Sequence, residues 1–506
     1  MIPNDKFQKL FHPESVAVIG ASATPGKWGF GILHNLIQGR FPGKIYPINV
    51  KEKEILGRPA YPSLLEVPGP VDLAVIVVPP EKVISAVQDC GRKGVGAVVI
   101  ITAGFGEVGP EEMRLQQELA QVIRATGMVA IGPNCQGVMS AHAQLFAQFL
   151  WIFPPAGKIS IVSQSGNVGG SLIGRGLAFG IGFSKFISSG NEAVTKCHEL
   201  IEYLGDDPET DVIMSYIEGV PQGQAFFQAL RRVCPKKPVV ILKGGVTEAG
   251  SKACTSHTGV LAGESNLFFS ACRQAGATIV DDLDDLFYTA VTFASQPLPK
   301  SNQVGIVTWG GGWGVLAADA CVKEGLQVAP LPAGVMEQLN EFLPSRWSHN
   351  NPVDLAAGGG PGVLSRTLEI IARDPAFDGV VQLGIGISAF LRFMTASSFY
   401  FSHPDRGKVQ DAMIKAAIES DQKFSEKVMR LSRETGKPIL SASDTASSPS
   451  EDNVVMETFR QEGKIIYPTP FHAARCLGHL ARYAKFRQKN LNERASAPVV
   501  RRAPKI

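Results

Sequence analysis

Short apolar runs alternate with polar, helix-compatible stretches along most of the chain. The first five runs are SVAVIG, KIYPIN, VDLAVIVV, GAVVIITAG and MVAIGPN. They are spaced roughly 20–30 residues apart, and continuous apolar runs of this kind are typical of parallel strands buried on both faces. The stretches 81–92 and 110–126 between them carry apolar residues at helical spacing. Residues 1–145 are therefore predicted to form a doubly wound, Rossmann-like α/β domain.

The same alternation returns twice. After the Pro-containing stretch WIFPPAG at 151–157, the runs KISIVSQSG, FSKFIS, DVIMSYIEG and PVVILKGG predict a second α/β domain over 155–296. The polar segment SQPLPKSNQ at 295–303 is typical of a linker. Beyond it, the runs NQVGIVTWGGGWG, FDGVVQLGIG and KPILSASD predict a third α/β domain over 302–485. Its stretch 393–434 is too long for a simple connection and is predicted as a helical insertion.

Composition narrows the class of protein. The chain has 506 residues with 49 basic and 46 acidic side chains, a formal charge of +3, and 44% hydrophobic residues. This length suits about three domains of roughly 100–200 residues each. A balance so close to neutral offers no basic face for phosphates, so nucleic-acid binding is not expected. The tail, residues 486–506, is charged and basic and is predicted to be disordered.

The spacing of the cysteines and the length of the apolar runs indicate where the protein is located and whether it binds a metal. The eight cysteines are scattered, without a CxxC pair or a zinc-type His/Cys cluster. We therefore expect reduced thiols in a cytoplasmic protein, and no metal site. The start, MIPNDKFQKLFHP, lacks the pattern of a signal peptide. Since no apolar stretch reaches the roughly 18–20 residues that span a bilayer, no membrane insertion is expected.

A glycine-rich turn follows the first predicted strand. GASATPGKWGFGIL leads directly into a helix, whose first backbone N–H groups are free to bind an anion. A tight turn without a ligand is the alternative. The lysine in this turn adds a charge for a phosphate. The candidate binding residues here are Gly20, Ser22, Pro25, Gly26 and Lys27.

The turn departs from the dinucleotide fingerprint. Ser22 stands where the second glycine should be, and Asn49 and Lys51 stand where an acidic ribose-binding residue is wanted, so a nicotinamide oxidoreductase is disfavoured. Three further Pro- or Gly-containing turns, VVPPE, TAGFGE and GPNCQG, follow later strands of the same sheet, where they are expected to meet at its carboxyl edge. The remaining candidates for this site are Asn49, Lys51, Val78, Pro79, Ala103, Gly104 and Asn134.

The second domain carries the titratable candidates. Its first strand ends in Ser163, followed by Ser165 and Gly166 at a helix start, which suits either a phosphate or a simple N-cap. His257 lies among small and hydroxyl residues in KACTSHTGVLAGES, although a lone histidine is more often structural. Glu218 ends the strand DVIMSYIEG, where it can orient an imidazole or remain a solvated loop acid.

Taken in order, GASATPGKWG, GPNCQG, IVSQSGNVGG and SHTGVLAG resemble the nucleoside-diphosphate-forming acyl-CoA synthetases, the family of succinyl-CoA synthetase and ADP-forming acetyl-CoA synthetase. NPVDLAAGG at 351–359 resembles a further motif of the third domain, so the resemblance covers residues 8–480. It implies a Rossmann-like CoA-binding domain followed by two flavodoxin-like ligase domains of the succinyl-CoA-synthetase type. It also implies that His257 becomes a phosphohistidine steadied by Glu218.

The implied reaction interconverts acyl-CoA, ADP and phosphate with a carboxylic acid, ATP and coenzyme A. The family's nucleotide site lies in an ATP-grasp domain, whose pattern we do not find in these residues. The resemblance therefore implies an alpha-type subunit that receives ATP or ADP and Mg²⁺ through an ATP-grasp beta-type partner. A CoA- or acyl-CoA-binding regulatory protein without turnover stays open as the alternative. Trp309 and Trp313, around a triple-glycine turn, suggest either an aromatic-lined site or ordinary packing.

Overall fold

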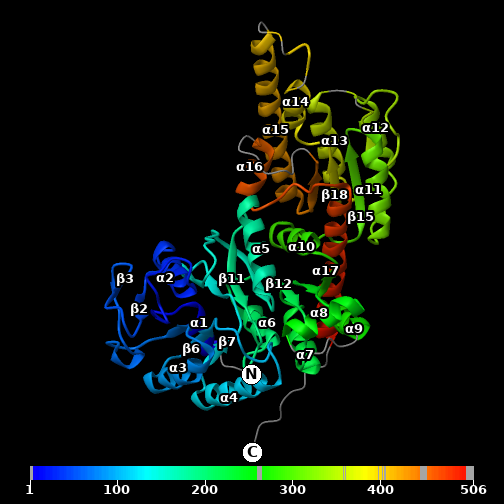
Figure 1. The fold of residues 1–506 in the computed structure, drawn as a ribbon. Coiled ribbons are helices and arrows are strands. Elements are labelled where there is room, and N and C mark those ends of the chain that lie inside the picture. The colour runs from blue at the N-terminus through cyan, green and yellow to red at the C-terminus, as the bar shows by residue number, and fades with distance from the viewer. Residues whose placement is uncertain are drawn as a thin grey trace, which may run out of the picture. The chain divides into compact units, whose positions relative to one another are not determined.

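The computed structural model describes residues 4–258, 265–356, 358, 360–396, 398–401, 403, 406–444 and 453–496. The chain divides into two compact units, Met1–Ala290 and Val291–Ile506. Each unit is an α/β structure built on parallel strands (Figure 1). The predicted α/β class is therefore confirmed. None of the helices in the described part of the chain is both long enough and apolar enough to span a membrane.

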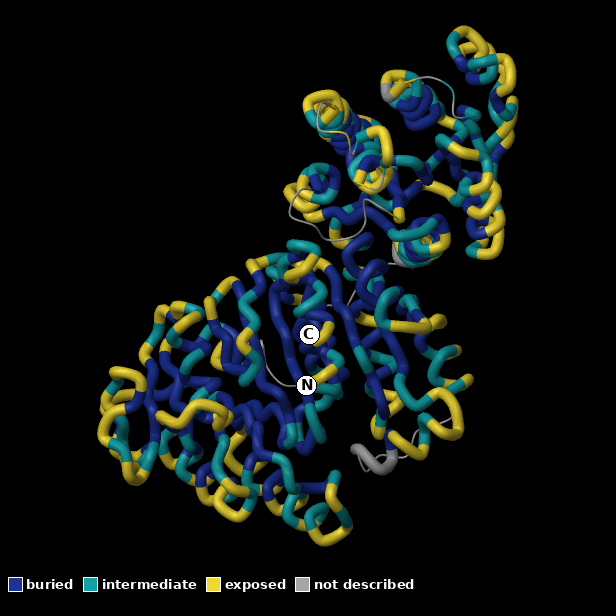
Figure 2. The backbone as a smooth tube through the Cα atoms, turned by 45° about the horizontal axis from the view of Figure 1, so that its top comes forward, coloured by how far each residue is buried: buried dark blue, intermediate teal, exposed yellow. Residues whose placement is uncertain are grey.

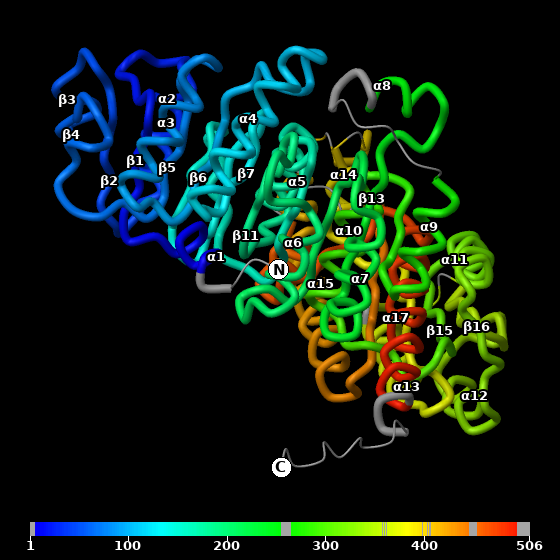
Figure 3. The backbone as a smooth tube through the Cα atoms, turned by 90° about the horizontal axis from the view of Figure 1, so that it is seen from below, coloured from blue at the N-terminus to red at the C-terminus, as the bar shows by residue number. Residues whose placement is uncertain are grey.

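The first sheet of unit 1 has five parallel strands in the order β2-β1-β5-β6-β7, which Figure 3 shows side by side. The apolar runs form these strands because both faces are covered, and β1 is buried along its whole length. The strands are β1 (Ser15–Ile19), β2 (Lys44–Ile48), β5 (Leu73–Ile76), β6 (Ala97–Ile100) and β7 (Val129–Ile131), with the hairpin β3 (Glu54–Ile55) and β4 (Arg58–Pro59) beside them. The helices are α1 (Asn4–Phe11), α2 (Trp28–Gln38), η1 (Leu64–Glu66), α3 (Pro80–Lys93) and α4 (Pro110–Thr126).

The second sheet of unit 1 has seven strands in the order β14-β13-β12-β10-β11-β8-β9. The strands are β8 (Gly137–Ser140), β9 (Leu145–Gln148), β10 (Ala156–Ser163), β11 (Phe183–Ser188), β12 (Val212–Ile217), β13 (Val239–Lys243) and β14 (Thr278–Val280). The helices are α5 (Gly166–Phe179), α6 (Cys197–Asp206), α7 (Gly223–Val233), α8 (Glu248–Thr258), α9 (Ser265–Ala275) and α10 (Leu283–Ser295).

One boundary differs from the sequence expectation. Strand β8 pairs antiparallel with β11, and β9 pairs with β8, so this hairpin extends the second sheet and not the first. The expected end of the first domain at residue 145 therefore falls inside the second sheet. Apolar runs report burial, but they do not report which sheet a strand joins.

Unit 2 holds a third sheet in the order β16-β15-β18-β19, with β17 also pairing with β15. The strands are β15 (Gln303–Thr308), β16 (Gln327–Val328), β17 (Val353–Asp354), β18 (Gly379–Leu383) and β19 (Ile439–Ala442). The helices are α11 (Gly311–Lys323), α12 (Ala333–Asn340), α13 (Pro361–Arg373), α14 (Ile387–Ala396), α15 (Gly407–Thr435), α16 (Val454–Gln461) and α17 (Pro470–Ser496). In this unit, as in unit 1, most strand residues are buried and the exposed residues lie mainly on the helices and loops (Figure 2).

The tail prediction was partly wrong. Helix α17 continues to Ser496, so residues 486–496 are helical and not disordered. Leu480 and Tyr483, which are both buried, anchor the middle of this helix, and the Asn490 side-chain amide donates to the Phe486 carbonyl oxygen at 2.9 Å. A high charge content did not prevent a helix here, because Gln, Lys, Leu, Glu and Arg are good helix formers once a helix is anchored. Residues 497–506 lie outside the described part.

Candidate functional site

The twelve candidates in the first domain lie in loops at one edge of the first sheet. These loops follow the carboxyl ends of β1, β2, β5, β6 and β7, as parallel strands require. Strand β1 lies between β2 and β5. The strand order therefore reverses at β1 and β5, and ligands of doubly wound sheets bind at such a switch point. The turns after Ile19 and Ile76 thus border the predicted crevice.

Glycines allow the first turn to pack closely against the sheet. Gly20 has a φ of +95°, and a Cβ there would lie 2.8 Å from the carbonyl oxygen of Val77. A Cβ on Gly29 would lie 2.1 Å from the carbonyl oxygen of Gly20. Only glycine lets the first turn of α2 approach the end of β1 so closely. Gly26 has a φ of +88° and open space around it, so there the backbone conformation favours glycine.

The candidates in the turns after β1 and β2 divide into two groups. The buried hydroxyl of Ser22 accepts a hydrogen bond from the Thr24 N–H at 3.1 Å. The Asn49 amide donates to the Ala21 carbonyl at 2.8 Å, and its oxygen accepts from the Lys51 N–H at 2.8 Å. These two side chains hold the turns together. Pro25, Gly26, Lys27 and Lys51 are exposed and free to meet a ligand.

The later turns are linked by further hydrogen bonds. The Thr102 hydroxyl donates to the carbonyl oxygen of Val78 at 2.7 Å. This hydrogen bond joins the turn after β5, which contains Pro79, to the turn after β6, which contains Ala103. The Gly104 N–H donates to Glu107 at 2.6 Å. Burial alone would raise the pKa of the Glu107 carboxyl, but hydrogen bonds from Asn191 and the backbone lower it overall. This carboxylate therefore keeps the β6 turn rigid.

The first sheet's edge continues into the second sheet's edge. The Asn134 side-chain amide donates to the Asn191 side-chain oxygen at 3.2 Å, and Asn191 also donates to Gln116 at 2.8 Å. A Cβ on Gly190 would lie 2.3 Å from the Pro133 carbonyl oxygen. The loop after β11 thus packs directly on the turn after β7, inside unit 1.

The predicted phosphate-binding residues begin helix α5. Ser165 is the N-cap and accepts from the Val168 N–H at 3.4 Å. The Ser163 hydroxyl donates to the Ser165 carbonyl at 2.5 Å, and a Cβ on Gly166 would lie 2.8 Å from the Gln136 side chain. The N-cap role that the sequence left open is therefore present, and the first turn of the helix starts at the carboxyl end of β10.

Gln164, in the middle of this motif, joins three turns. Its oxygen accepts from the N–H groups of Glu218 and Gly219 at 2.6 and 3.0 Å. Its amide donates to the Gly219 carbonyl at 2.8 Å and to Glu192 at 3.0 Å. Burial raises the pKa of the Glu192 carboxyl, although hydrogen bonds from Gln164 and Ser189 oppose the shift. Neither Gln164 nor Glu192 belongs to the residues predicted from the sequence, and only the position of Gln164 between the two serines could have suggested it.

Glu218 is buried, with 5% of its surface exposed, at the carboxyl end of β12. The Lys243 ammonium donates to the Glu218 backbone carbonyl at 2.7 Å, and burial lowers the pKa of this lysine. Burial and the nearby Glu218 charge raise the pKa of the Cys254 thiol in α8. A buried carboxylate at a strand end therefore faces α8.

The backbone of His257 lies in the last turn of α8, three residues after Cys254. The side chain of His257 and residues 259–264 lie outside the described part. The contact between His257 and Glu218 stays a prediction.

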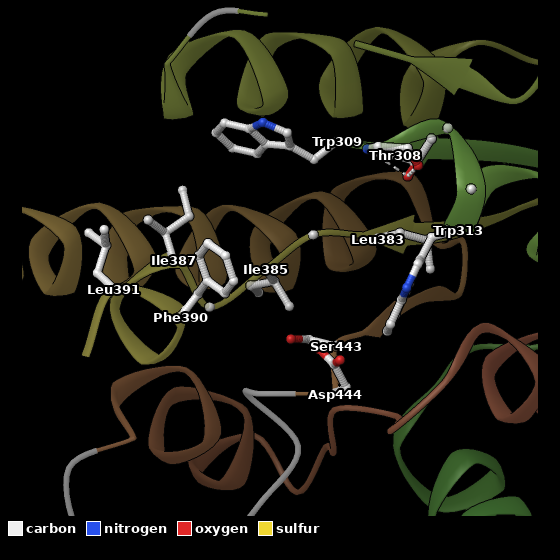
Figure 4. Close-up of a pocket in the computed structure, with 15 residues that line it drawn as sticks. Thr308, Trp309, Trp313, Leu383, Ile385, Ile387, Phe390, Leu391, Ser443 and Asp444 are labelled. Carbon is white, nitrogen blue, oxygen red and sulfur yellow. Dashed lines mark hydrogen bonds between the residues drawn. The ribbon is translucent and has the colours of Figure 1, made fainter. Parts of the chain in front are cut away.

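A cavity of about 600 Å³ opens at the carboxyl ends of β15, β18 and β19 in unit 2 (Figure 4). Trp309 and Trp313, the aromatic residues of the glycine turn, both line it. The other residues of its wall were not predicted from the sequence, because they follow strands far apart in the chain. They include Thr308, Leu383, Ile385, Ile387, Phe390, Leu391, Ser443 and Asp444.

Within the described residues, no cluster of three or more His, Cys, Asp or Glu side chains has the arrangement of a metal site. All eight cysteines are buried, and none of them forms a disulfide bond.

Three protein families match successive parts of the chain. Residues 14–141 match the CoA-binding domain, residues 156–293 the succinyl-CoA ligase-like flavodoxin domain, and residues 304–394 the ligase-CoA domain. The chain is 44% identical over 376 residues to the alpha subunit of ADP-forming acetate–CoA ligase II from Pyrococcus furiosus, covering 74% of this chain and 81% of that one. It is 35% identical to the alpha subunit of ligase I from the same organism, covering 96% and 99%.

A solved structure extends the match to the whole fold. The dinucleotide-forming acetyl-coenzyme A synthetase 1 of Candidatus Korarchaeum cryptofilum, solved in complex with phosphate and ADP, superposes with a TM-score of 0.82 at 30% identity. The match covers 97% of this chain and 99% of that one. By contrast, the chain spans 54% of the length of ADP-forming acetate–CoA ligase I from Archaeoglobus fulgidus, to which it is 40% identical. These relatives are ligases, so the regulatory alternative is set aside. The chain belongs to the nucleoside-diphosphate-forming acyl-CoA synthetases, acid–thiol ligases, as an alpha-subunit-like member.

Proposed function

We propose that this chain carries the CoA-binding and phosphoryl-carrying parts of an ADP-forming acyl-CoA synthetase, with His257 as the phosphorylated residue. One observation carries the proposal. The start of α5, the buried Glu218 and helix α8, which contains His257, follow strands of the second sheet at the same sheet edge. Helix N-termini stabilise a phosphoryl anion without reorganisation, and a buried carboxylate orients an imidazole.

The reaction balances in three steps. Phosphate attacks the acyl-CoA thioester, which gives an acyl phosphate and releases coenzyme A as a thiol. The neutral imidazole of His257 takes the phosphoryl group and frees the carboxylic acid. ADP then takes the phosphoryl group from the histidine and becomes ATP. Ser163, Ser165 and Gly166 would hold the phosphoryl group in transit, and the reverse sequence activates the acid.

We propose that coenzyme A binds at the edge of the first sheet. The exposed Lys27 and Lys51 offer cations to its phosphates, and the first backbone N–H groups of α2, which begins at Trp28, would bind them. Ser22 and Asn49 would act through the shape of the turn, because their polar atoms bond to the backbone. Val78, Pro79, Ala103, Gly104 and Asn134 would complete the walls of the crevice.

We further propose an ATP-grasp beta-type partner that supplies ATP or ADP and Mg²⁺. The term subunit alpha in the names of the Pyrococcus furiosus relatives supports it, as does the greater length of the Archaeoglobus ligase. The eight cysteines, none of which forms a disulfide bond, support a cytoplasmic location. The names of the relatives include acetate, 4-hydroxybutyrate and trans-feruloyl-CoA. These names therefore do not identify one acid as the substrate of this chain.

Phosphoryl labelling tests the proposal. The full chain is incubated with radioactive phosphate and a panel of acetyl-, phenylacetyl- and feruloyl-CoA, and the label is mapped by peptide analysis. We expect an acid-labile, base-stable label on His257, absent from His257→Asn and formed more slowly by Glu218→Gln, because an amide supports a cationic imidazole less well. His142→Asn serves as the control, since the His142 ring hydrogen-bonds to the Gly157 carbonyl at 2.9 Å and is not among the proposed site residues. A label on another residue would refute the assigned mechanism.

A further inference from the structure

Tyr216 lies near the carboxyl end of β12, two positions before Glu218. Every other residue of this strand is buried, whereas Tyr216 is only partly buried. In the sheet it pairs with Ser163 of β10 on one side and with Leu242 of β13 on the other. The tyrosine therefore lies between the strand that leads to α5 and the strand that leads to α8, at the edge where phosphoryl transfer is proposed.

The Tyr216 hydroxyl interacts directly with the side chain of Glu218. It donates a hydrogen bond to the Glu218 carboxylate, and burial together with this negative charge raises the pKa of the tyrosine. The two side chains meet beside Gly244, because a Cβ on this glycine would lie 2.5 Å from the tyrosine oxygen and 3.4 Å from Cγ of Glu218. A hydrogen bond to an ionised group is about twice as strong as one between neutral groups.

The turn after β13 leaves room for this contact. Gly244 packs against the tyrosine, and a Cβ on the next residue, Gly245, would lie 2.8 Å from the Cys254 sulfur of α8. A side chain on either glycine would push the turn away from its neighbour. The pair of glycines therefore lets one turn pack against both the tyrosine and the helix that contains His257.

Glu218 is also held through its backbone. Its N–H donates to the Gln164 side chain at 2.6 Å, and its carbonyl oxygen accepts from the Lys243 ammonium at 2.7 Å. The same ammonium donates to the Gly244 carbonyl, which ties the end of β12 to the turn after β13. These backbone contacts fix where the Glu218 side chain begins, but they do not select one of its rotamers. The Tyr216 hydroxyl acts on the carboxylate itself.

We propose that Tyr216 is a positioning residue, whose hydroxyl holds the Glu218 carboxylate in the orientation that steadies the His257 imidazole during phosphoryl transfer. This inference rests on the proposed function. A carboxylate that orients an imidazole must point in one direction, and a hydrogen bond from a neighbouring side chain supplies that direction. Because the tyrosine acts through Glu218, its hydroxyl matters only as far as the carboxylate is present.

Rapid-quench labelling of the full chain, with radioactive phosphate and the acyl-CoA panel, tests the proposal. Tyr216→Phe should slow the labelling of His257 about tenfold, because it keeps the ring and removes one hydrogen bond to a charged group. Tyr203→Phe is the matched control. The Tyr203 hydroxyl is buried and has no hydrogen-bond partner among the described residues, so its loss should leave the rate unchanged. Thermal unfolding checks that both variants are folded.

A double-variant cycle separates positioning from a purely structural role. In Glu218→Gln the tyrosine meets a neutral amide oxygen, and a hydrogen bond of about half the strength remains. Adding Tyr216→Phe to this background should therefore slow labelling only about threefold, against about tenfold in the original chain. Equal factors in the two backgrounds would mean that the tyrosine acts without the carboxylate, which overturns the proposal.

Gly244→Ala disturbs the same contact from the other side. Its methyl group would lie 2.5 Å from the tyrosine oxygen, so the hydroxyl must move away from the carboxylate. Labelling should slow by about the same factor as in Tyr216→Phe. Gly223→Ala, at the start of α7, is the control with an unchanged rate, since no neighbouring atom lies within 4 Å of its Cβ position. Normal labelling by Gly244→Ala would contradict the proposal.

The two proposals can fail separately. If the original chain is labelled on His257 and Tyr216→Phe is labelled equally fast, the proposed function stands and the positioning role is lost. If the original chain is never labelled, with any acyl-CoA of the panel, the phosphohistidine mechanism is lost, and the role of Tyr216 is lost with it.

Discussion

The carboxylate of Asp421 accepts hydrogen bonds from both the backbone N–H and the hydroxyl of Ser388, at 2.7 and 2.6 Å. Both residues are buried, and they are 33 positions apart in the chain. Asp421 lies in α15 and Ser388 in the first turn of α14, so one helix of the long insertion caps the other from the side.

Asp421→Asn should destabilise the chain by about 1–3 kcal/mol, because an amide nitrogen faces a buried N–H donor in place of a carboxylate oxygen. Chemical denaturation measures the effect. Asp411→Asn on the exposed face of the same helix is the control and should change stability by less than about 0.5 kcal/mol. Equal stability of the two variants would show that the cap is unimportant.

Gln164→Met should slow the labelling of His257 about tenfold or more while leaving the affinity for coenzyme A within about twofold of the original value. The variant keeps the side-chain volume but leaves the buried N–H groups of Glu218 and Gly219 without an acceptor, at about 1–3 kcal/mol for each unpaired group. Rapid-quench labelling and calorimetry measure the two quantities. Gln117→Met, on the exposed surface of α4, should change neither. Normal labelling in Gln164→Met would remove Gln164 from any positioning role.

Gly29→Ala should destabilise unit 1 and abolish coenzyme A binding, because its methyl group would lie 2.1 Å from the Gly20 carbonyl oxygen. The helix start must then move away from the first turn. Gly174→Ala provides the comparison, since that helical glycine has no atom within 4 Å of its Cβ position and the change should stabilise by up to about 1 kcal/mol. Calorimetry with coenzyme A reports the outcome, and unaltered binding by Gly29→Ala would contradict the predicted site.

His479 should make unit 2 sensitive to acid. Burial, assisted by the charges of Arg482 and Arg475, lowers the pKa of this histidine from 6.5 to about 3. The unfolded chain therefore takes up a proton below pH 6.5 that the folded chain refuses until about pH 3, so stability is lost as the pH falls through this window. Between pH 7.5 and 5.5 the loss from this residue is about 1.4 kcal/mol.

Denaturant unfolding at the two pH values measures this loss for the original chain and for His479→Leu. The variant should lose about 1.4 kcal/mol less than the original chain over the same interval. The same pH dependence in both chains would mean that His479 titrates normally or that other groups dominate.

The amino-acid sequence by itself determined the class of the fold and the edge of each sheet where chemistry is expected. SVAVI and LAVI became β1 and β5 because a strand covered on both faces must be apolar at every position. The motif order was enough to identify the family, since short glycine and hydroxyl motifs at strand ends reflect what a backbone must do near phosphates.

Only the tertiary structure decided which of these residues meet. The Gln164 side chain accepts a hydrogen bond from the Glu218 N–H, 54 positions away in the chain. Trp309 and Phe390, which follow different strands, line the same cavity in unit 2. The strand β8 looked like part of the first domain and pairs in the second sheet. Periodicity records whether a residue is buried, but the choice of partner depends on the packing of distant segments, which no local pattern contains.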